Sequence, residues 1–203
     1  MMKKWYKLIA GFLMMLMMVS VLAGCRQNAS PIELSKLKND GGFAYAGTPW
    51  GGDAETVVAQ VDALLENYPG LEGNRPGEAL YVVEGLPFEG EEWHGEWQLD
   101  DDGFLWCVSF LLETSDKEGE KLYKKLSAEL ETLYGEANEA VYLPAEFHYS
   151  LRPELAENRY AKKWYSTDKK TRLSLVQYDK DGVSSTVGIV LMGREEEFTL
   201  PTT

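Results

Sequence analysis

Two stretches of the chain repeat apolar residues every three or four positions, and each has its own start and stop signals. Residues 54–67 follow Asp53, a suitable N-cap, and run into a Tyr-Pro-Gly sequence that ends a helix. Residues 116–134 follow Ser115, whose Ser-Asp-Lys-Glu sequence matches a capping box, and stop at Gly135. The spacing predicts two amphipathic helices.

Period-two or continuous apolar patterns predict six strands, at residues 79–84, 92–99, 104–112, 160–167, 171–179 and 183–192. Residues 92–99 alternate, which places the tryptophans on one face and Glu92, His94 and Glu96 on the other. An Asp-Asp-Asp-Gly turn then leads into 104–112, which is apolar on both faces. A strand of that kind is expected to be central in its sheet and covered by a helix.

A helix followed by strands occurs twice along the chain, and this order predicts an α+β fold. We expect an antiparallel sheet with the two main helices packed on one face. Residues 136–158 contain Pro144 and Pro153 and predict no element. In element order alone, the chain is similar to small exported domains such as the β-lactamase inhibitor protein and the BamE-type outer-membrane assembly lipoproteins.

The first 25 residues have the composition of an export signal. Lys3, Lys4 and Lys7 precede an apolar run, which ends in Leu22-Ala23-Gly24-Cys25. This stretch resembles the lipobox of bacterial lipoproteins. The resemblance implies cleavage before Cys25, lipidation of its sulfur, and an extracytoplasmic domain held by lipid to the bacterial cell membrane. The alternative is an uncleaved transmembrane helix in which the cysteine is incidental.

These features divide the chain into a signal peptide (1–24), a lipidated cysteine with a flexible tether (25–42) and a single α+β domain (43–203). The tether is predicted because residues 26–42 have few large apolar side chains and no sustained period.

Charge is uneven along the chain, which has 20 basic and 33 acidic residues. Loss of residues 1–24 would leave 17 basic residues against 33 acidic ones, a net charge of −16. Residues 40–120 hold 19 acidic side chains and two basic ones. This balance argues against nucleic acid as a partner and favours a basic partner or loosely held divalent cations, unless the acidic surface serves only solubility.

The clearest candidate for chemistry is the sequence around His94. On a strand, Glu92, His94 and Glu96 share one face, and the only other histidine, His148, could join them. A hydrolase or metal site is one interpretation, although no helical His-Glu-x-x-His pattern is present. The two Asp-rich turns resemble calcium loops only in part, and hairpin turns explain them more simply.

Aromatic and cysteine residues give weaker indications. Trp50 and Trp164 are the better candidates for surface contacts, although core packing is the simpler role for every tryptophan. Cys107, the only cysteine besides Cys25, is predicted to be a small buried residue of the 104–112 strand.

The sequence therefore supports two functional hypotheses, neither with a predicted cofactor. The first is a non-enzymatic envelope lipoprotein whose domain binds a macromolecular partner or ligand through an exposed apolar or aromatic patch. The alternative is an envelope hydrolase that uses Glu92, His94 or Glu96, with or without a metal.

Overall fold

A computed structural model describes residues 30–40, 42–47, 50–144, 158–179 and 184–193. The chain divides into two compact units, Met1–Ser30 and Pro31–Thr203. All of the described helices and strands belong to the second unit.

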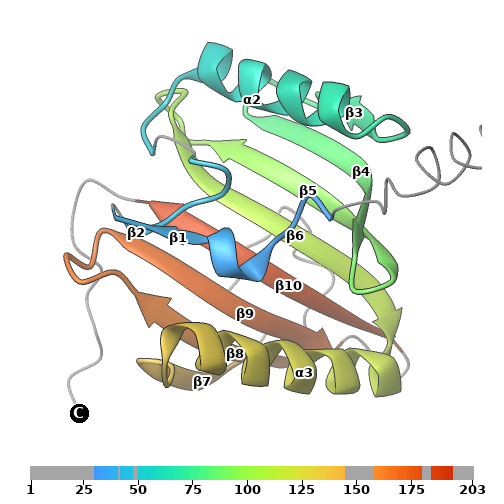
Figure 1. Ribbon diagram of the computed structural model, residues 1–203, viewed down its shortest axis with the longest axis vertical. Helices are drawn as coiled ribbons and strands as arrows, with labels where there is room; N and C mark the ends of the chain where they lie inside the picture. The colour runs from blue at the N-terminus through green and yellow to red at the C-terminus, as the bar shows by residue number, and fades with distance from the viewer. Residues whose placement is uncertain (1–29, 41, 48–49, 145–157, 180–183, 194–203) are drawn as a thin grey trace, which may run out of the picture. The chain divides into compact units, whose positions relative to one another are not determined.

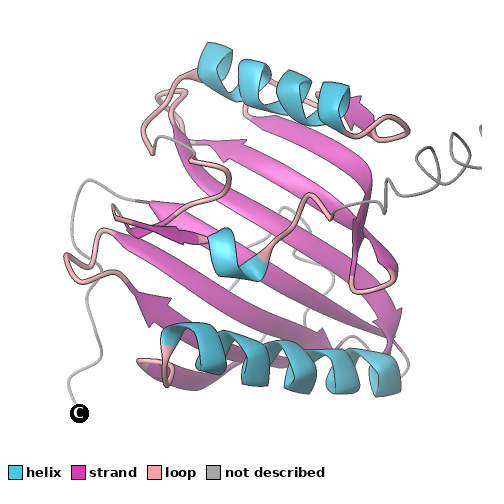
Figure 2. Cartoon of the chain, in the orientation of Figure 1, coloured by secondary structure: helices cyan, strands magenta, loops and turns pink. Residues whose placement is uncertain are grey.

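The described elements are two α-helices, one short 3-10 helix (η1) and ten strands, which confirms the predicted α+β class (Figures 1 and 2). In chain order they are η1 (Leu34–Lys36), β1 (Lys38–Asn39), β2 (Gly42–Phe43), α2 (Ala54–Asn67), β3 (Glu72–Asn74), β4 (Leu80–Phe88), β5 (Glu91–Leu99), β6 (Leu105–Ser115), α3 (Asp116–Tyr134), β7 (Glu139–Pro144), β8 (Asn158–Tyr165), β9 (Thr171–Asp179) and β10 (Ser184–Gly193).

Eight of these strands form one antiparallel sheet in the order β3-β4-β5-β6-β10-β9-β8-β7. Each half of the sheet is a meander of four strands that follows its own helix, so the predicted repetition of helix and strands is present. The last strands of the two meanders, β6 and β10, pair with each other from Cys107 to Ser115. This pairing makes β6 a central strand, as its apolar pattern predicted.

Both helices begin and end where the capping residues predicted. The Asp53 carboxylate accepts a hydrogen bond from the Thr56 backbone N–H at 2.9 Å, and the Ser115 hydroxyl accepts one from Glu118 N–H at 3.4 Å. Gly135 ends α3 with a positive φ of 85°, a conformation that favours glycine. Figure 1 shows α2 and α3 on the same face of the sheet, called here the first face.

The main core lies between this face and the helices. It contains the fully buried Trp93 and Trp97 from β5, Phe110 from β6, Leu126 and Leu130 from α3, and apolar residues of the second meander. Aromatic rings meet edge to face in this core, with Trp97 and Phe110 centroids 6.1 Å apart. The prediction that the tryptophans of residues 92–99 share one apolar face is therefore confirmed.

Residues 31–40 correct the predicted boundary between tether and domain. Ile32, Leu34 and Leu37 are 1–3% exposed and belong to the main core, where η1 lies between α2 and α3 (Figure 1). The Tyr134 hydroxyl of α3 donates to the Leu34 carbonyl, and the Phe43 backbone N–H donates to the Thr171 hydroxyl at 2.8 Å. Three apolar residues in a polar stretch are enough to fill the space between two helices, and the domain therefore begins at Pro31.

Sequence reasoning also missed several strands. The small strands β1, β2 and β3 and the edge strand β7 lie in stretches without a clear period, and β7 falls in the segment 136–158 for which no element was predicted. Residues 145–157 of that segment lie outside the described residues. No helix in the described part of the chain is long and apolar enough to cross a membrane.

The packing of residues 31–40 gives a direct test of the domain boundary. Leu37→Ala should lower the free energy of unfolding by about 2–4 kcal/mol, because it leaves a cavity in the core. Lys36→Ala, one position away on an exposed side chain, is the matched control and should change it by less than about 0.5 kcal/mol. Urea unfolding of the purified protein measures both changes. If Leu37→Ala left the unfolding free energy unchanged, residues 31–40 would be part of a flexible tether and the boundary at Pro31 would be wrong.

Candidate functional site

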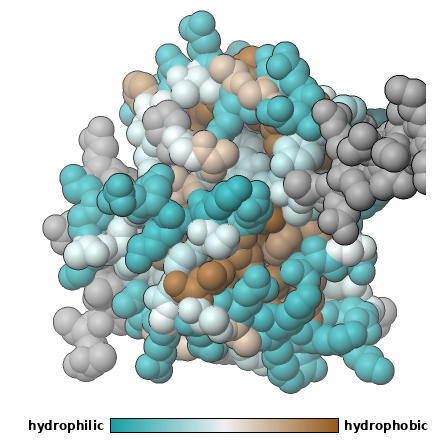
Figure 3. All heavy atoms as spheres, in the orientation of Figure 1, coloured by the Kyte–Doolittle hydropathy of each residue, from teal (hydrophilic) through white to brown (hydrophobic). Residues whose placement is uncertain are grey.

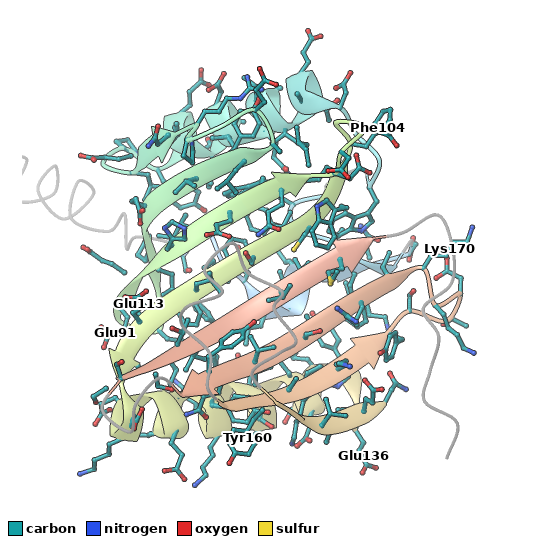
Figure 4. All side chains as sticks on the ribbon, turned by 180° about the vertical axis from the view of Figure 1, so that it is seen from behind. Glu91, Phe104, Glu113, Glu136, Tyr160 and Lys170 are labelled. Carbon is teal, nitrogen blue, oxygen red and sulfur yellow. The ribbon has the colours of Figure 1, made fainter. Side chains whose placement is uncertain are left out.

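The sheet face opposite the helices, called here the second face, carries polar side chains that the register aligns in rows. Glu96 pairs with Ser109, Ser109 with Val190, Val190 with Ser174, and Ser174 with Lys163 across five adjacent strands. Figure 4 views the molecule from this side. Several of these polar residues are buried, with Glu96 4% and Ser174 3% exposed. Buried polar groups of this kind need partners, so their hydrogen bonds decide what the face can do.

The most concentrated group on the second face is the His94 cluster, which comprises Glu84, His94, Glu96, Gln98 and Ser109. His94 Nδ1 lies 2.7 Å from a Glu84 carboxylate oxygen, and His94 Nε2 lies 2.9 Å from a Glu96 carboxylate oxygen. The second Glu96 oxygen accepts from Gln98 Nε2 at 3.0 Å and from the Ser109 hydroxyl at 3.5 Å. The cluster thus joins strands β4, β5 and β6.

This geometry favours a doubly protonated imidazole. The hydrogen bond to Glu96 raises the pKa of His94, and the Glu84 carboxylate adds to this effect, while burial opposes it. With a proton on each ring nitrogen, His94 can donate one hydrogen bond to Glu84 and one to Glu96. Its positive charge then balances the negative charge of Glu96, whose side chain is only 5% exposed. The cluster is therefore suited to holding three strands together.

The arrangement is poorly suited to metal binding or general-base chemistry. Either role needs a neutral imidazole with one free lone pair, but both His94 nitrogens face carboxylates. No group of three or more His, Cys, Asp or Glu side chains among the described residues could hold a metal ion. The Glu92 side chain is exposed and makes no hydrogen bond or ion pair within the described part of the chain, and His148 lies outside it.

The raised pKa of His94 predicts how stability depends on pH. Its contribution should be complete below about pH 6.5, the ordinary value for histidine, and be lost as the pH rises through the higher pKa of the folded state. His94→Gln should therefore lower the unfolding free energy by about 1–3 kcal/mol at pH 5.5 and by less at pH 9. Urea unfolding of both proteins at each pH measures this difference. An equal loss of unfolding free energy at both pH values would contradict a charged His94 held between Glu84 and Glu96.

The second candidate is an open pocket of about 600 Å³ at the end of the β5–β6 hairpin, called here the corner pocket. The lining side chains that bear on its chemistry are Glu78, Leu80, Gln98, Asp100, Asp101 and Trp106. The Leu99 backbone N–H donates to the Ala79 carbonyl at 2.8 Å, which holds the 76–80 loop against β5. In Figure 4 the labelled Phe104 marks this end of the hairpin.

Trp106 reaches the corner pocket because β6 contains a bulge. Leu99 pairs with Leu105 while Gln98 pairs with Cys107, which leaves Trp106 as the extra residue. Trp106 packs against a small second-face cluster, which includes Cys107, Val190 and Met192, rather than in the main core, and it is only partly buried. Core packing was the simpler role predicted for Trp106, and the bulge places its side chain against this second-face cluster instead of the main core.

The corner pocket is acidic. Glu78, Asp100 and Asp101 are exposed, and none of them forms a salt bridge with the described residues. The nearby Arg75 donates to the backbone carbonyls of Gly77 and Glu78 and stacks on Tyr81, 4.7 Å from the ring centroid. The pocket therefore keeps a negative charge that its own walls do not balance.

A third site is a pocket of about 460 Å³ between α2 and the 31–46 segment, called here the N-terminal pocket. Its polar side chains serve the fold: the Tyr45 hydroxyl donates to the Pro31 carbonyl at 3.2 Å, and Gln60 donates to the Tyr45 carbonyl and accepts from Trp97. Burial raises the pKa of Tyr45 far above its ordinary value. With these groups already engaged, the N-terminal pocket has less to offer a ligand than the corner pocket.

The remaining predicted residues are structural where the structure describes them. Trp164 is 2% exposed and donates to the Gly135 carbonyl at 2.9 Å, and Trp50 is partly buried and donates to the Phe43 carbonyl at 2.8 Å. Burial rules out the surface contact predicted for Trp164, whereas the contact predicted for the partly buried Trp50 stays a prediction. Cys107 is buried as predicted, and burial raises its pKa to about 12, which makes it a poor nucleophile.

Exposed apolar surface is limited. Figure 3 shows a band of apolar side chains on the first face between η1 and α3, bordered by hydrophilic ones. The large apolar residues that the described part of the chain exposes most are Phe104 in the β5–β6 turn, Leu133 of α3 and Tyr160 of β8. Figure 4 places Phe104 and Tyr160 at opposite ends of the sheet, so they do not form one patch.

Comparison with known proteins adds no assignment: no protein-family model matches the chain, and no curated protein or solved structure matches it significantly. Function is therefore inferred from the geometry of these sites.

Proposed function

We propose that this chain is a lipid-anchored lipoprotein of the bacterial cell envelope whose α+β domain binds a macromolecular partner without catalysing a reaction. The observation that carries the binding function is the corner pocket, where an aromatic side chain and unbalanced carboxylates surround an open concavity. Aromatic anchors at the margin of a pocket are common in protein recognition.

The anchor rests on the lipobox-like sequence that ends at Cys25. Because the domain begins at Pro31, only residues 26–30 separate it from the proposed lipid. Six residue steps span at most about 20–22 Å, so the domain would stay close to the lipid headgroups. Its net negative charge gives no attraction to an anionic surface, which leaves the lipid as the main source of attachment.

An envelope hydrolase remains the second candidate, because His94 and Glu96 do lie within hydrogen-bond distance. Three features weigh against it: both imidazole nitrogens are engaged, the Glu96 carboxylate is buried, and Glu92 takes no part. His94 could act as a base only after it gave up one of its two hydrogen bonds to carboxylates.

The anchor is tested by Cys25→Ala. The variant should leave the membrane fraction while its thermal unfolding stays unchanged, because Cys25 lies outside the domain that begins at Pro31. Fractionation of cells that express each form measures the effect, and the neighbouring Arg26→Ala is the matched control that should remain bound. A Cys25→Ala protein that stayed firmly on the membrane after signal cleavage would contradict a lipid anchor.

Partner binding at the corner pocket is tested by site-specific photo-crosslinking in cells that make the full chain. A photoreactive residue at Asp101, beside the pocket, should give a discrete crosslinked product, whereas one at the exposed Asp62 of α2 should not. No product at Asp101, or the same products at both positions, would contradict a binding function for this pocket.

A further inference from the structure

The corner pocket combines three features that select for a cation. It has an aromatic face from Trp106, carboxylates from Glu78, Asp100 and Asp101, and the side chain of Gln98 at its inner wall. Gln98 is 7% exposed, and its Nε2 is committed to Glu96. The Gln98 side chain is thus held in place by Glu96 where it lines the pocket.

The carboxylates of the corner pocket differ in how firmly the surrounding structure holds them. One Asp100 oxygen accepts from the backbone N–H groups of Asp102 and Phe104, at 3.0 and 2.9 Å, and this fixes the turn. Asp101 and Glu78 make no comparable bonds within the described residues and can turn toward a ligand. The site thus offers acceptors, and its walls bring no ion pair that a ligand would have to displace.

The aromatic wall is fixed in position as well. Trp106 is the extra residue of the β6 bulge, and its ring packs on the second-face cluster while part of it remains accessible. Bulges re-aim side chains at functional edges of sheets. An indole face held next to carboxylates is the arrangement that binds an ammonium or guanidinium group together with its methylene stem.

We propose that the corner pocket receives a lysine or arginine side chain from an extended basic segment of an exported partner protein. This inference rests on the proposed binding function and specifies its chemistry. Charge complementarity favours this occupant, because residues 40–120 hold 19 acidic side chains and two basic ones. A metal ion is a weaker fit, since no described group of three His, Cys, Asp or Glu residues could hold one.

The test uses the purified full-length chain in nonionic detergent and a capped tetralysine peptide as the probe. Calorimetry should detect binding that weakens as salt rises from 20 to 150 mM, and capped tetraglutamate should not bind. In NMR spectra of protein with ¹⁵N-labelled tryptophans, the Trp106 indole N–H signal is assigned as the one that Trp106→Phe removes. That signal should shift most when the peptide is added. Peptide binding without that shift, or equal binding of both peptides, would overturn the proposal.

Matched variants separate the site from general charge attraction. Asp101→Asn should weaken tetralysine binding at least about threefold, whereas Asp62→Asn, the same charge change on α2, should weaken it less than about 1.5-fold. Trp106→Leu should weaken it about two- to fivefold, while Trp106→Phe should retain most of the affinity because it keeps an aromatic face. Equal effects at Asp101 and Asp62 would contradict a defined pocket.

Three further outcomes have fixed meanings. If Trp106→Leu fails to fold, Asp101→Asn and Glu78→Gln decide the matter, since both residues are exposed. If capped single lysine bound as tightly as tetralysine, the ligand would be a small amine and not a segment of a protein, and this would overturn the proposed occupant. A crosslinked partner at Asp101 together with no tetralysine binding would overturn the cationic chemistry and leave the proposed binding function intact.

Discussion

The pairing of β6 with β10 is the constraint on which the rest of the structure depends. Each meander alone would have an apolar strand, β6 or β10, at its edge, and an unpaired edge of that kind invites aggregation. Their antiparallel register, Leu112 with Val187 and Phe110 with Ile189, buries both strands and makes one continuous sheet. The same register places α2 and α3 on one face and aligns the polar rows of the other.

The two faces of this sheet have separate roles. The first face, the two helices and residues 31–40 together form the main core. The second face supports the buried His94 cluster and, at the hairpin end, the accessible corner pocket. Both depend on β5 and β6: alternation along β5 sends His94, Glu96 and Gln98 to the second face, and the β6 bulge turns Trp106 to join them. A rigid central pair of strands thus positions residues that a loop would leave variable.

Local signals in the sequence were sufficient to predict the fold class, both helices with their caps, and the central place of β6. They were insufficient wherever tertiary context decides. Ile32, Leu34 and Leu37 are too few to show a period, yet they fill the gap between the helices. Core packing of Trp106 was predictable, but its place on the second face was not, because the pattern of apolar residues does not reveal the β6 bulge. The face shared by His94 and Glu96 was predictable, but the Glu84 contact from β4 was not, because it depends on strand register.

Native-state hydrogen exchange tests the central claim, that the β6–β10 pair unites both halves in one cooperative unit. Backbone amides of β6 from Val108 to Leu112 and of β10 from Val187 to Leu191 should exchange only through global unfolding, with free energies that match each other and the value from urea unfolding. Exchange of the β10 amides at a clearly lower free energy than those of β6 would show that the second meander opens on its own, and would contradict this account.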